Sequence, residues 1–201
     1  GPVGSYSAAM GVINSTTAAN GFALFDSDAL NTQYTPQEAT LTYNGAIDCS
    51  AFQYININFE CYHRVFNDSV FVEISTDNFA TVAGRYRIQP ALASNESSPN
   101  PELVSLNISS SAGNQPSVYL RFHYEGEWDY ATMIDDVTFS ETPDNELILS
   151  NQTFGGWWLG YQLSGDLGCD YTLYPMSQAT AMPYRIEGVV RNSGIQTQNN
   201  I

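Results

Sequence analysis

The segment Tyr54–Tyr62 reads YININFECY, and its alternation of apolar and polar residues decides the fold. Successive side chains of an extended chain point to opposite faces, so a period of two is typical of a β-strand with one buried face. The residues predicted to face the core are Ile55, Ile57, Phe59 and Cys61. The segment therefore predicts a strand, and the position of Cys61 predicts a buried thiol.

The same alternation recurs along the chain. In the clearest further case, Ser117–Glu125, we expect Val118 and its alternate neighbours to face inward. The other strands that alternation or β-branched content predicts are Ser69–Ser75, Leu103–Ser109, Phe22–Phe25, Ala39–Tyr43, Arg85–Gln89, Thr132–Ser140 and Glu146–Leu149.

No segment of ten or more residues carries an apolar stripe of helical period, and turn-rich stretches such as SNESSPNP (94–101) separate the strands. Many short strands in a chain of this length predict an all-β fold, a two-sheet antiparallel jelly-roll sandwich. We expect this domain to span residues 1–142. An aromatic, glycine-rich linker would follow at 143–183, and the first strand of an incomplete immunoglobulin-like module at 184–201, within Tyr184–Val190.

The charge of the chain disfavours some partners. The 201 residues carry 21 acidic and six basic side chains, all six of them arginine, for a net charge of −15. Such a chain has little with which to neutralise phosphates, so nucleic acid and anionic membranes are unlikely partners. No apolar run is long enough to span a bilayer, and we predict no membrane insertion. The three cysteines are too few for a disulfide framework, although one bridge stays open.

Two pairs of aspartates suggest a metal site. Asp26 and Asp28 follow the first predicted strand, and Asp135 and Asp136 lie in one of the last. The terminal strands of a jelly roll often lie side by side, and Ca²⁺ accepts carboxylate and carbonyl oxygens in forgiving geometry. The alternative is that the first pair caps a turn and the second pair marks a β-bulge.

The outward faces of two strands suggest a ligand surface. Tyr119, Arg121 and His123 project from one predicted strand, and Asn56 and Asn58 from another. If the two strands share a sheet, rings, amides and a guanidinium form a floor suited to a sugar. An ordinary solvated sheet face is the alternative.

An enzymatic role has little support in the sequence. Glucanases built on jelly rolls use an E-x-D-x-x-E strand, in which two carboxylates flank the scissile bond. Glu127 and Asp129 match the first half of that motif, but Thr132 occupies its last position. The serine-hydrolase and zinc-protease motifs are absent. We therefore predict a non-catalytic protein.

An ordered series of segments resembles the MAM-like, cleaved-adhesin-type jelly rolls of secreted multidomain bacterial proteins. The segments are NGFALFDSD (20–28), AIDCS (46–50), INFECYHR (57–64), VEISTDNF (72–79), VYLRFHYEG (118–126) and MIDDV (133–137). The resemblance implies a non-catalytic, exported domain whose calcium is held by acids of the first and last segments. Position by position, these acids are Asp26, Asp28, Asp135 and Asp136. One departure is that Asn78 and Phe79 replace the glycines of the family's usual hairpin.

Taken together, the sequence predicts a calcium-stabilised, secreted or cell-surface module for adhesion, whose ligand is a carbohydrate or another surface protein. Two alternatives stay open. One is an accessory domain of an exported peptidase or glycosidase. The other is a filament subunit that self-assembles when Tyr184–Val190 adds to a neighbour's sheet.

Overall fold

The computed structural model describes residues 1–30, 35–154 and 186–199. Contacts within the chain divide it into two units, Gly1–Glu141 and Thr142–Ile201, and each is described by itself. None of the helices among these residues is long and apolar enough to cross a membrane.

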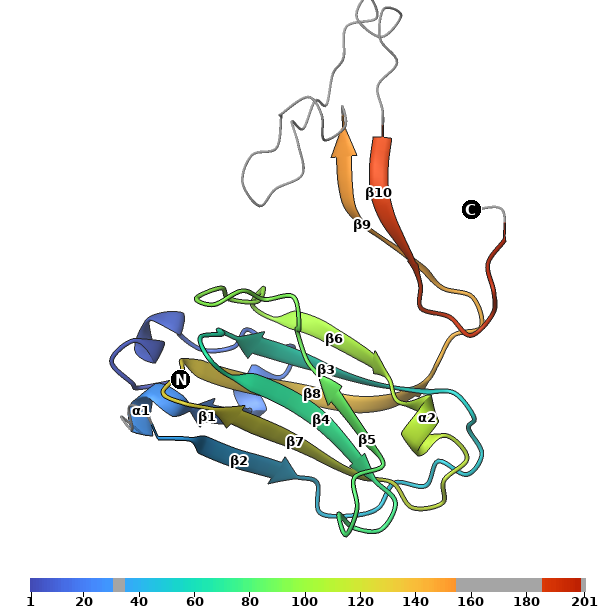
Figure 1. Cartoon of the computed structure of the whole chain (residues 1–201), viewed down its shortest axis with the longest axis horizontal. Helices are drawn as coiled ribbons and strands as arrows, with labels where there is room; N and C mark the ends of the chain where they lie inside the picture. Colours follow the sequence, from blue (N-terminus) through green and yellow to red (C-terminus); the bar gives the residue numbers. More distant parts are fainter. Residues whose placement is uncertain (31–34, 155–185, 200–201) are drawn as a thin grey trace, which may run out of the picture. The chain divides into compact units, whose positions relative to one another are not determined.

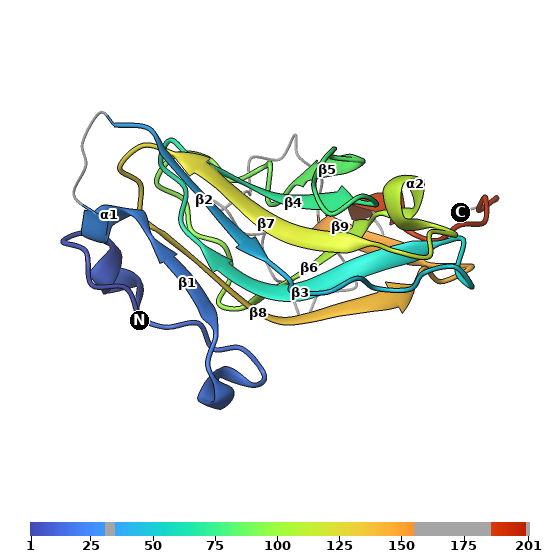
Figure 2. The same ribbon diagram turned by 90° about the horizontal axis from the view of Figure 1, so that it is seen from below.

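The first unit contains eight strands in two antiparallel sheets (Figures 1 and 2). One sheet has the order β1-β8-β3-β6 and the other β2-β7-β4-β5. The bounds are β1 Ala23–Asp26, β2 Gln37–Thr42, β3 Ile55–His63, β4 Ser69–Ser75, β5 Gly84–Arg87, β6 Glu102–Asn107, β7 Tyr119–Gly126 and β8 Ala131–Glu141. Short helices α1 (Ser27–Leu30) and α2 (Ser109–Ala112) and the 3₁₀ turns Ser7–Met10 and Ala18–Asn20 occupy the connections.

The strand order is that of a jelly roll. Consecutive strands change sheet at every connection except the β4–β5 hairpin, so that β1 and β8 become neighbours in one sheet and β2 and β7 in the other. This strand order corresponds to two Greek-key motifs. The predicted all-β, two-sheet sandwich is confirmed, and each predicted strand of this unit is present to within a few residues.

The core lies between the sheets and is built from the alternating residues that the sequence assigned to it. From β3, Ile57, Phe59 and Cys61 are fully buried, and from β7, Phe122 packs edge-on against Phe59. Burial raises the pKa of the Cys61 thiol far above its ordinary value. Cys49 is also buried, and both cysteines are free thiols.

The β4–β5 hairpin has two consecutive residues in the left-handed backbone region. Asn78 and Phe79 have φ of 56° and 62°, the left-handed region that favours glycine. The hydroxyl of Ser75 accepts hydrogen bonds from the amides of Asp77 (3.1 Å) and Phe79 (2.9 Å), which hold this turn. The ring of Phe79 in turn lies 4.4 Å from the guanidinium carbon of Arg121.

The N-terminal arm, residues 1–22, covers the outer face of the first sheet. Met10 and Ile13 of the arm pack against Ala131 and Met133 of β8, forming a second apolar cluster. These two β8 side chains alternate with Ile134, which faces the main core. The strand β8 is therefore buried on both faces where the arm crosses it.

The second unit contains one described pair of antiparallel strands, β9 (Leu147–Phe154) and β10 (Ile186–Asn192). Strand β9 lies inside the range expected to be a linker, and β10 overlaps the strand expected at Tyr184–Val190. Most of the aromatic, glycine-rich stretch and Cys169 lie outside the described residues. The immunoglobulin-like character of this unit and strand exchange by its last strand stay predictions.

Candidate functional site

The first aspartate pair holds the N-terminal arm. Asp26 Oδ2 accepts hydrogen bonds from the amides of Val3 (2.6 Å) and Gly4 (3.1 Å), and its Oδ1 accepts one from the Ser7 hydroxyl (2.7 Å). Asp26 also caps α1, because the same Oδ1 accepts the Ala29 amide at 3.2 Å. Burial alone raises the pKa of Asp26, but these four hydrogen bonds outweigh it and the net pKa is lowered.

Asp28 binds the next turn of the arm. Its Oδ2 accepts hydrogen bonds from the amides of Tyr6 and Ser7, the latter at 2.8 Å. Gly4 permits this close approach, because a Cβ at that position would overlap the Asp28 carboxylate. The partners of the early acids are thus mainly backbone amides that follow one another along the chain.

The second aspartate pair holds a later part of the arm. Asp135 Oδ2 accepts a hydrogen bond from Ser15 Oγ (2.6 Å), and Asp136 Oδ1 accepts one from Thr17 Oγ1 (2.6 Å). Between them, both oxygens of Glu60 receive hydrogen bonds from Thr16. The β3–β8 register shifts at this point, so the second pair lies at a β-bulge.

The two pairs do not meet. Strands β1 and β8 are neighbours as predicted, but they are antiparallel and Asp26 faces Ala131. Asp135 lies four residues further along β8, about 13 Å away at the usual rise per residue. The prediction of one calcium site built from all four acids is therefore wrong in its geometry. The roles observed are the turn cap and the bulge offered as the alternative, and calcium binding by either pair alone stays a prediction.

No cluster of three or more histidine, cysteine, aspartate or glutamate side chains arranged to hold a metal ion occurs in the described part of the chain.

The predicted ligand surface is also divided. Arg121 and His123 lie on β7 in the second sheet, whereas Asn56 and Asn58 lie on β3 in the first. The outward faces of these sheets are opposite faces of the sandwich, so the two sets of side chains do not form one floor. On β3, Asn58 Nδ2 donates to Ser140 Oγ at 2.8 Å. On β7, Tyr119 is half-buried opposite Ser75 of β4.

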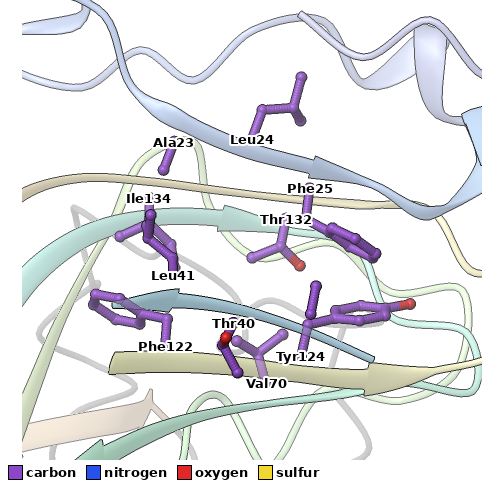
Figure 3. A pocket seen from close by; sticks show the side chains of 11 residues that line it. Ala23, Leu24, Phe25, Thr40, Leu41, Val70, Phe122, Tyr124, Thr132 and Ile134 are labelled. Atoms are coloured by element: carbon purple, nitrogen blue, oxygen red, sulfur yellow. The ribbon is translucent and has the colours of Figure 1, made fainter. Parts of the chain in front are cut away.

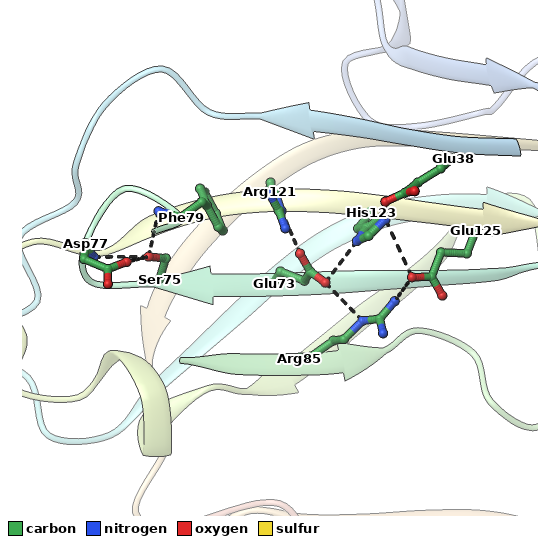
Figure 4. Close-up of polar contacts among 9 residues, drawn as sticks. All are labelled: Glu38, Glu73, Ser75, Asp77, Phe79, Arg85, Arg121, His123 and Glu125. Carbon is green, nitrogen blue, oxygen red and sulfur yellow. Dashed lines mark hydrogen bonds and ion pairs between the residues drawn. The ribbon is translucent and has the colours of Figure 1, made fainter. Parts of the chain in front are cut away.

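The outward face of β7 belongs to an ion-pair network centred on Glu73 of β4 (Figure 4). Glu73 is 3% exposed and binds Arg121 Nε at 2.6 Å, Arg85 Nε at 3.0 Å and His123 Nδ1 at 3.0 Å. Burial alone raises the pKa of Glu73, but the hydrogen bonds from His123 and Arg121 outweigh it and the net pKa is lowered. Arg121 and His123 are therefore occupied within the protein.

The imidazole of His123 lies between two carboxylates. Its Nε2 lies 2.9 Å from Glu38 Oε1, and its Nδ1 lies 3.0 Å from Glu73 Oε1. The network therefore joins His123, Arg85 and Arg121 to the three carboxylates of Glu38, Glu73 and Glu125.

A different site lies where the arm reaches the end of the sandwich. We call it the aromatic pocket, a cavity of about 130 Å³ lined by Tyr6, Asp28, Phe66, Trp128, Asp129 and Tyr130. The residues come from the arm, α1, the β3–β4 connection and the β7–β8 connection. The rings of Tyr6 and Trp128 pack edge-on with their centroids 5.9 Å apart, and those of Phe66 and Tyr130 pack edge-on with centroids 6.4 Å apart. Four rings therefore surround two buried carboxyl groups.

The β7–β8 connection is shaped by Asp129, whose oxygens are fully used. Oδ1 accepts the Asn67 amide at 2.6 Å, and Oδ2 accepts the Tyr124 hydroxyl at 2.6 Å and the Glu127 amide at 2.7 Å. Glycine is required at position 126, because a Cβ there would overlap Asp129 Oδ2. The turn places Trp128 at φ 48°, a strained conformation for a large residue.

The two carboxylates of the pocket differ in how many of their oxygen atoms already accept hydrogen bonds. Asp129 accepts three hydrogen bonds and is 3% exposed, so its role is to hold the turn. Asp28 uses Oδ2 for the arm, and among the described residues no donor is bonded to its Oδ1. Asp28 is therefore the acceptor available to a bound molecule.

The sequence did not predict this pocket. Tyr6, Phe66 and Trp128 are far apart in the chain and share no spacing pattern. The one available signal was the polar and aromatic run Glu127–Tyr130 between two strands, since loop residues carried by a rigid sandwich often bind ligands. The same run also matches the first half of the E-x-D-x-x-E glucanase motif. Thr132, at the last position of that motif, faces the apolar interior.

Comparisons with known proteins identify no family. No protein-family model matches the chain, and no curated protein matches it. Among solved structures, a structure of infectious bursal disease virus Gx strain is similar at 11% identity and a TM-score of 0.30, over 59% of this chain and 30% of that one. The Gt strain structure gives 12% and 0.28, over 60% and 33%. The chain spans about a third of those proteins, and likenesses this low carry no argument about fold or function.

Proposed function

We propose that the unit Gly1–Glu141 is a non-catalytic binding module of an exported adhesion protein, and that it takes a neutral carbohydrate in the aromatic pocket. The observation that carries the proposal is the pocket itself, which four aromatic side chains line together with Asp28, a carboxylate whose Oδ1 is bonded to no donor among the described residues. Export and adhesion rest on the resemblance of the sequence segments to secreted jelly rolls.

The size and chemistry of the pocket support a sugar. A cavity of about 150 Å³ encloses benzene, so the pocket, at about 130 Å³, has room for part of a sugar ring rather than for the whole of it. Aromatic rings bury the C–H faces of a pyranose, while a carboxylate oxygen accepts a hydrogen bond from its hydroxyl group. The net charge of −15 argues against anionic sugars.

The test is binding of the purified chain to a glycan array, followed by calorimetry with the best ligand. Tyr6→Ala removes one wall of the pocket and should weaken binding by about tenfold, as truncation of a central aromatic contact does. Tyr43→Ala is the matched control: Tyr43 is 57% exposed, against 59% for Tyr6, and follows the far end of β2. The control should bind like the wild type.

Two outcomes contradict the proposal. One is glycan binding that responds equally to both tyrosine substitutions, since the ligand would then lie elsewhere. The other is binding of tetramethylammonium without binding of any glycan, because rings beside carboxylates also suit an organic cation. Binding of that cation alone would replace the carbohydrate with an ammonium ligand.

A further inference from the structure

A second cavity lies at the open side of the sandwich, and it is separate from the aromatic pocket. Strands β1 and β2 are the edges of their respective sheets, and the cavity lies between them (Figure 3). Its volume is about 200 Å³. Phe25 of β1 and Tyr124 of β7 meet at 4.2 Å on one side of it.

The lining of this cavity is mostly apolar, with eight apolar residues among its eleven. Phe122, Val70 and Ile134 are core residues that form its inner wall. Leu24 and Leu41 also line the cavity and are 40% and 50% exposed. Water forms few hydrogen bonds with such walls, whereas an apolar molecule that binds there is removed from water, which is favourable.

One polar atom in the lining has no partner. Thr132 of β8 is 4% exposed, and its oxygen is directed into the space between the sheets (Figure 3). Thr132 Oγ1 and Arg64 Nε are the buried side-chain polar atoms without a hydrogen bond in the described part of the chain. A buried hydroxyl without a partner costs free energy that valine, of nearly the same shape, would avoid.

We propose that this cavity binds a small, mostly apolar molecule with one hydroxyl or carbonyl group, which forms a hydrogen bond with Thr132 Oγ1. The volume sets the size at about one substituted ring or a short branched chain, because a 150 Å³ apolar cavity binds benzene. The apolar walls contact the hydrocarbon part of the molecule, and the buried, unpartnered hydroxyl of Thr132 binds its polar group.

The experiment uses p-cresol and p-xylene, which differ by a hydroxyl in place of a methyl group. Each is titrated into the full chain, and NMR shifts of the Val70, Leu41 and Ile134 methyl groups report occupancy. We expect p-cresol to bind about fivefold more tightly than p-xylene, the effect of one neutral hydrogen bond. Thr132→Val should remove this preference, and Thr132→Ser should retain it.

The control is Thr138→Val, on the same strand but on an exposed position, and it should leave both affinities unchanged. The proposal is overturned if these methyl groups do not respond up to the solubility limit of p-cresol. It is also overturned if the wild type binds both compounds equally, since Thr132 would then be satisfied by water. Neither result bears on the aromatic pocket, whose ligand is tested separately.

Discussion

Replacing Glu73 with glutamine removes one negative charge from the centre of the network on the second sheet. Glu73 is buried and binds Arg121 Nε, Arg85 Nε and His123 Nδ1 within 3.0 Å. Glutamine has nearly the same shape but offers one acceptor oxygen, and its amide group turns a donor toward groups that are themselves donors. The two arginines and His123 would be left around a neutral group.

The magnitude follows from burial. Removing one partner of a fully buried ion pair costs about 3–5 kcal/mol. Arg85 and Arg121 keep 39% and 23% of their side-chain surface exposed, so water recovers part of the loss. We therefore expect the free energy of unfolding to fall by about 3 kcal/mol, which lowers the melting temperature by roughly 9 °C in a protein of this size. Glu38→Gln is the control: its side chain is 72% exposed, and the loss should stay below about 1 kcal/mol.

Urea denaturation followed by circular dichroism measures both variants, and its pH dependence sharpens the test. The pKa of Glu73 is lowered in the folded protein, so its charge stabilises the fold at neutral pH and that contribution is lost on acidification. The gap between the wild type and Glu73→Gln should therefore narrow as the pH falls below about 5. A loss under about 1 kcal/mol at pH 7, or a gap that does not change with pH, would refute the reasoning.

Three further predictions concern the arm, the core and calcium. Gly4→Ala places a methyl group against the Asp28 carboxylate, so the free energy of unfolding should fall by about 1–3 kcal/mol and proteolysis of the arm should be faster. Gly45→Ala is the control: its nearest neighbour is a flexible tyrosine ring, and neither quantity should change. Cys61 should resist alkylation in the native protein and react on unfolding, as peptide mapping by mass spectrometry can show; rapid native labelling would mean that its strand opens. Asp26 already accepts four hydrogen bonds within the chain, so we expect EDTA to shift the melting temperature by less than about 1 °C. A fall of several degrees would instead support a calcium site at one pair.

The N-terminal arm connects both pairs of aspartates with the aromatic pocket. Its early residues are bound by Asp26 and Asp28, and its later residues by the acids around the β8 bulge. The arm also supplies Tyr6 to the aromatic pocket. Loss of the arm's attachment should therefore weaken ligand binding as well as stability.

The sequence by itself determined the strands and the direction in which their side chains face. A period of two is a local property of an extended chain, so Phe59, Cys61 and Phe122 could be assigned to the core without knowing their neighbours. The jelly roll followed because eight such strands in this length have few other ways to bury one face each. The acids were correctly placed beside the first and last strands.

Only the tertiary structure decided what those acids and outward faces meet. Because β1 and β8 are antiparallel, Asp26 of β1 pairs with Ala131 of β8, four residues from Asp135. The spacing of residues in the sequence does not reveal this separation. Whether β3 and β7 share a sheet depends on how the strands wind, and here they do not. The aromatic pocket combines Tyr6 of the arm with Phe66, 60 residues away, and Trp128, 122 residues away, because packing in three dimensions brings together side chains that no local pattern connects.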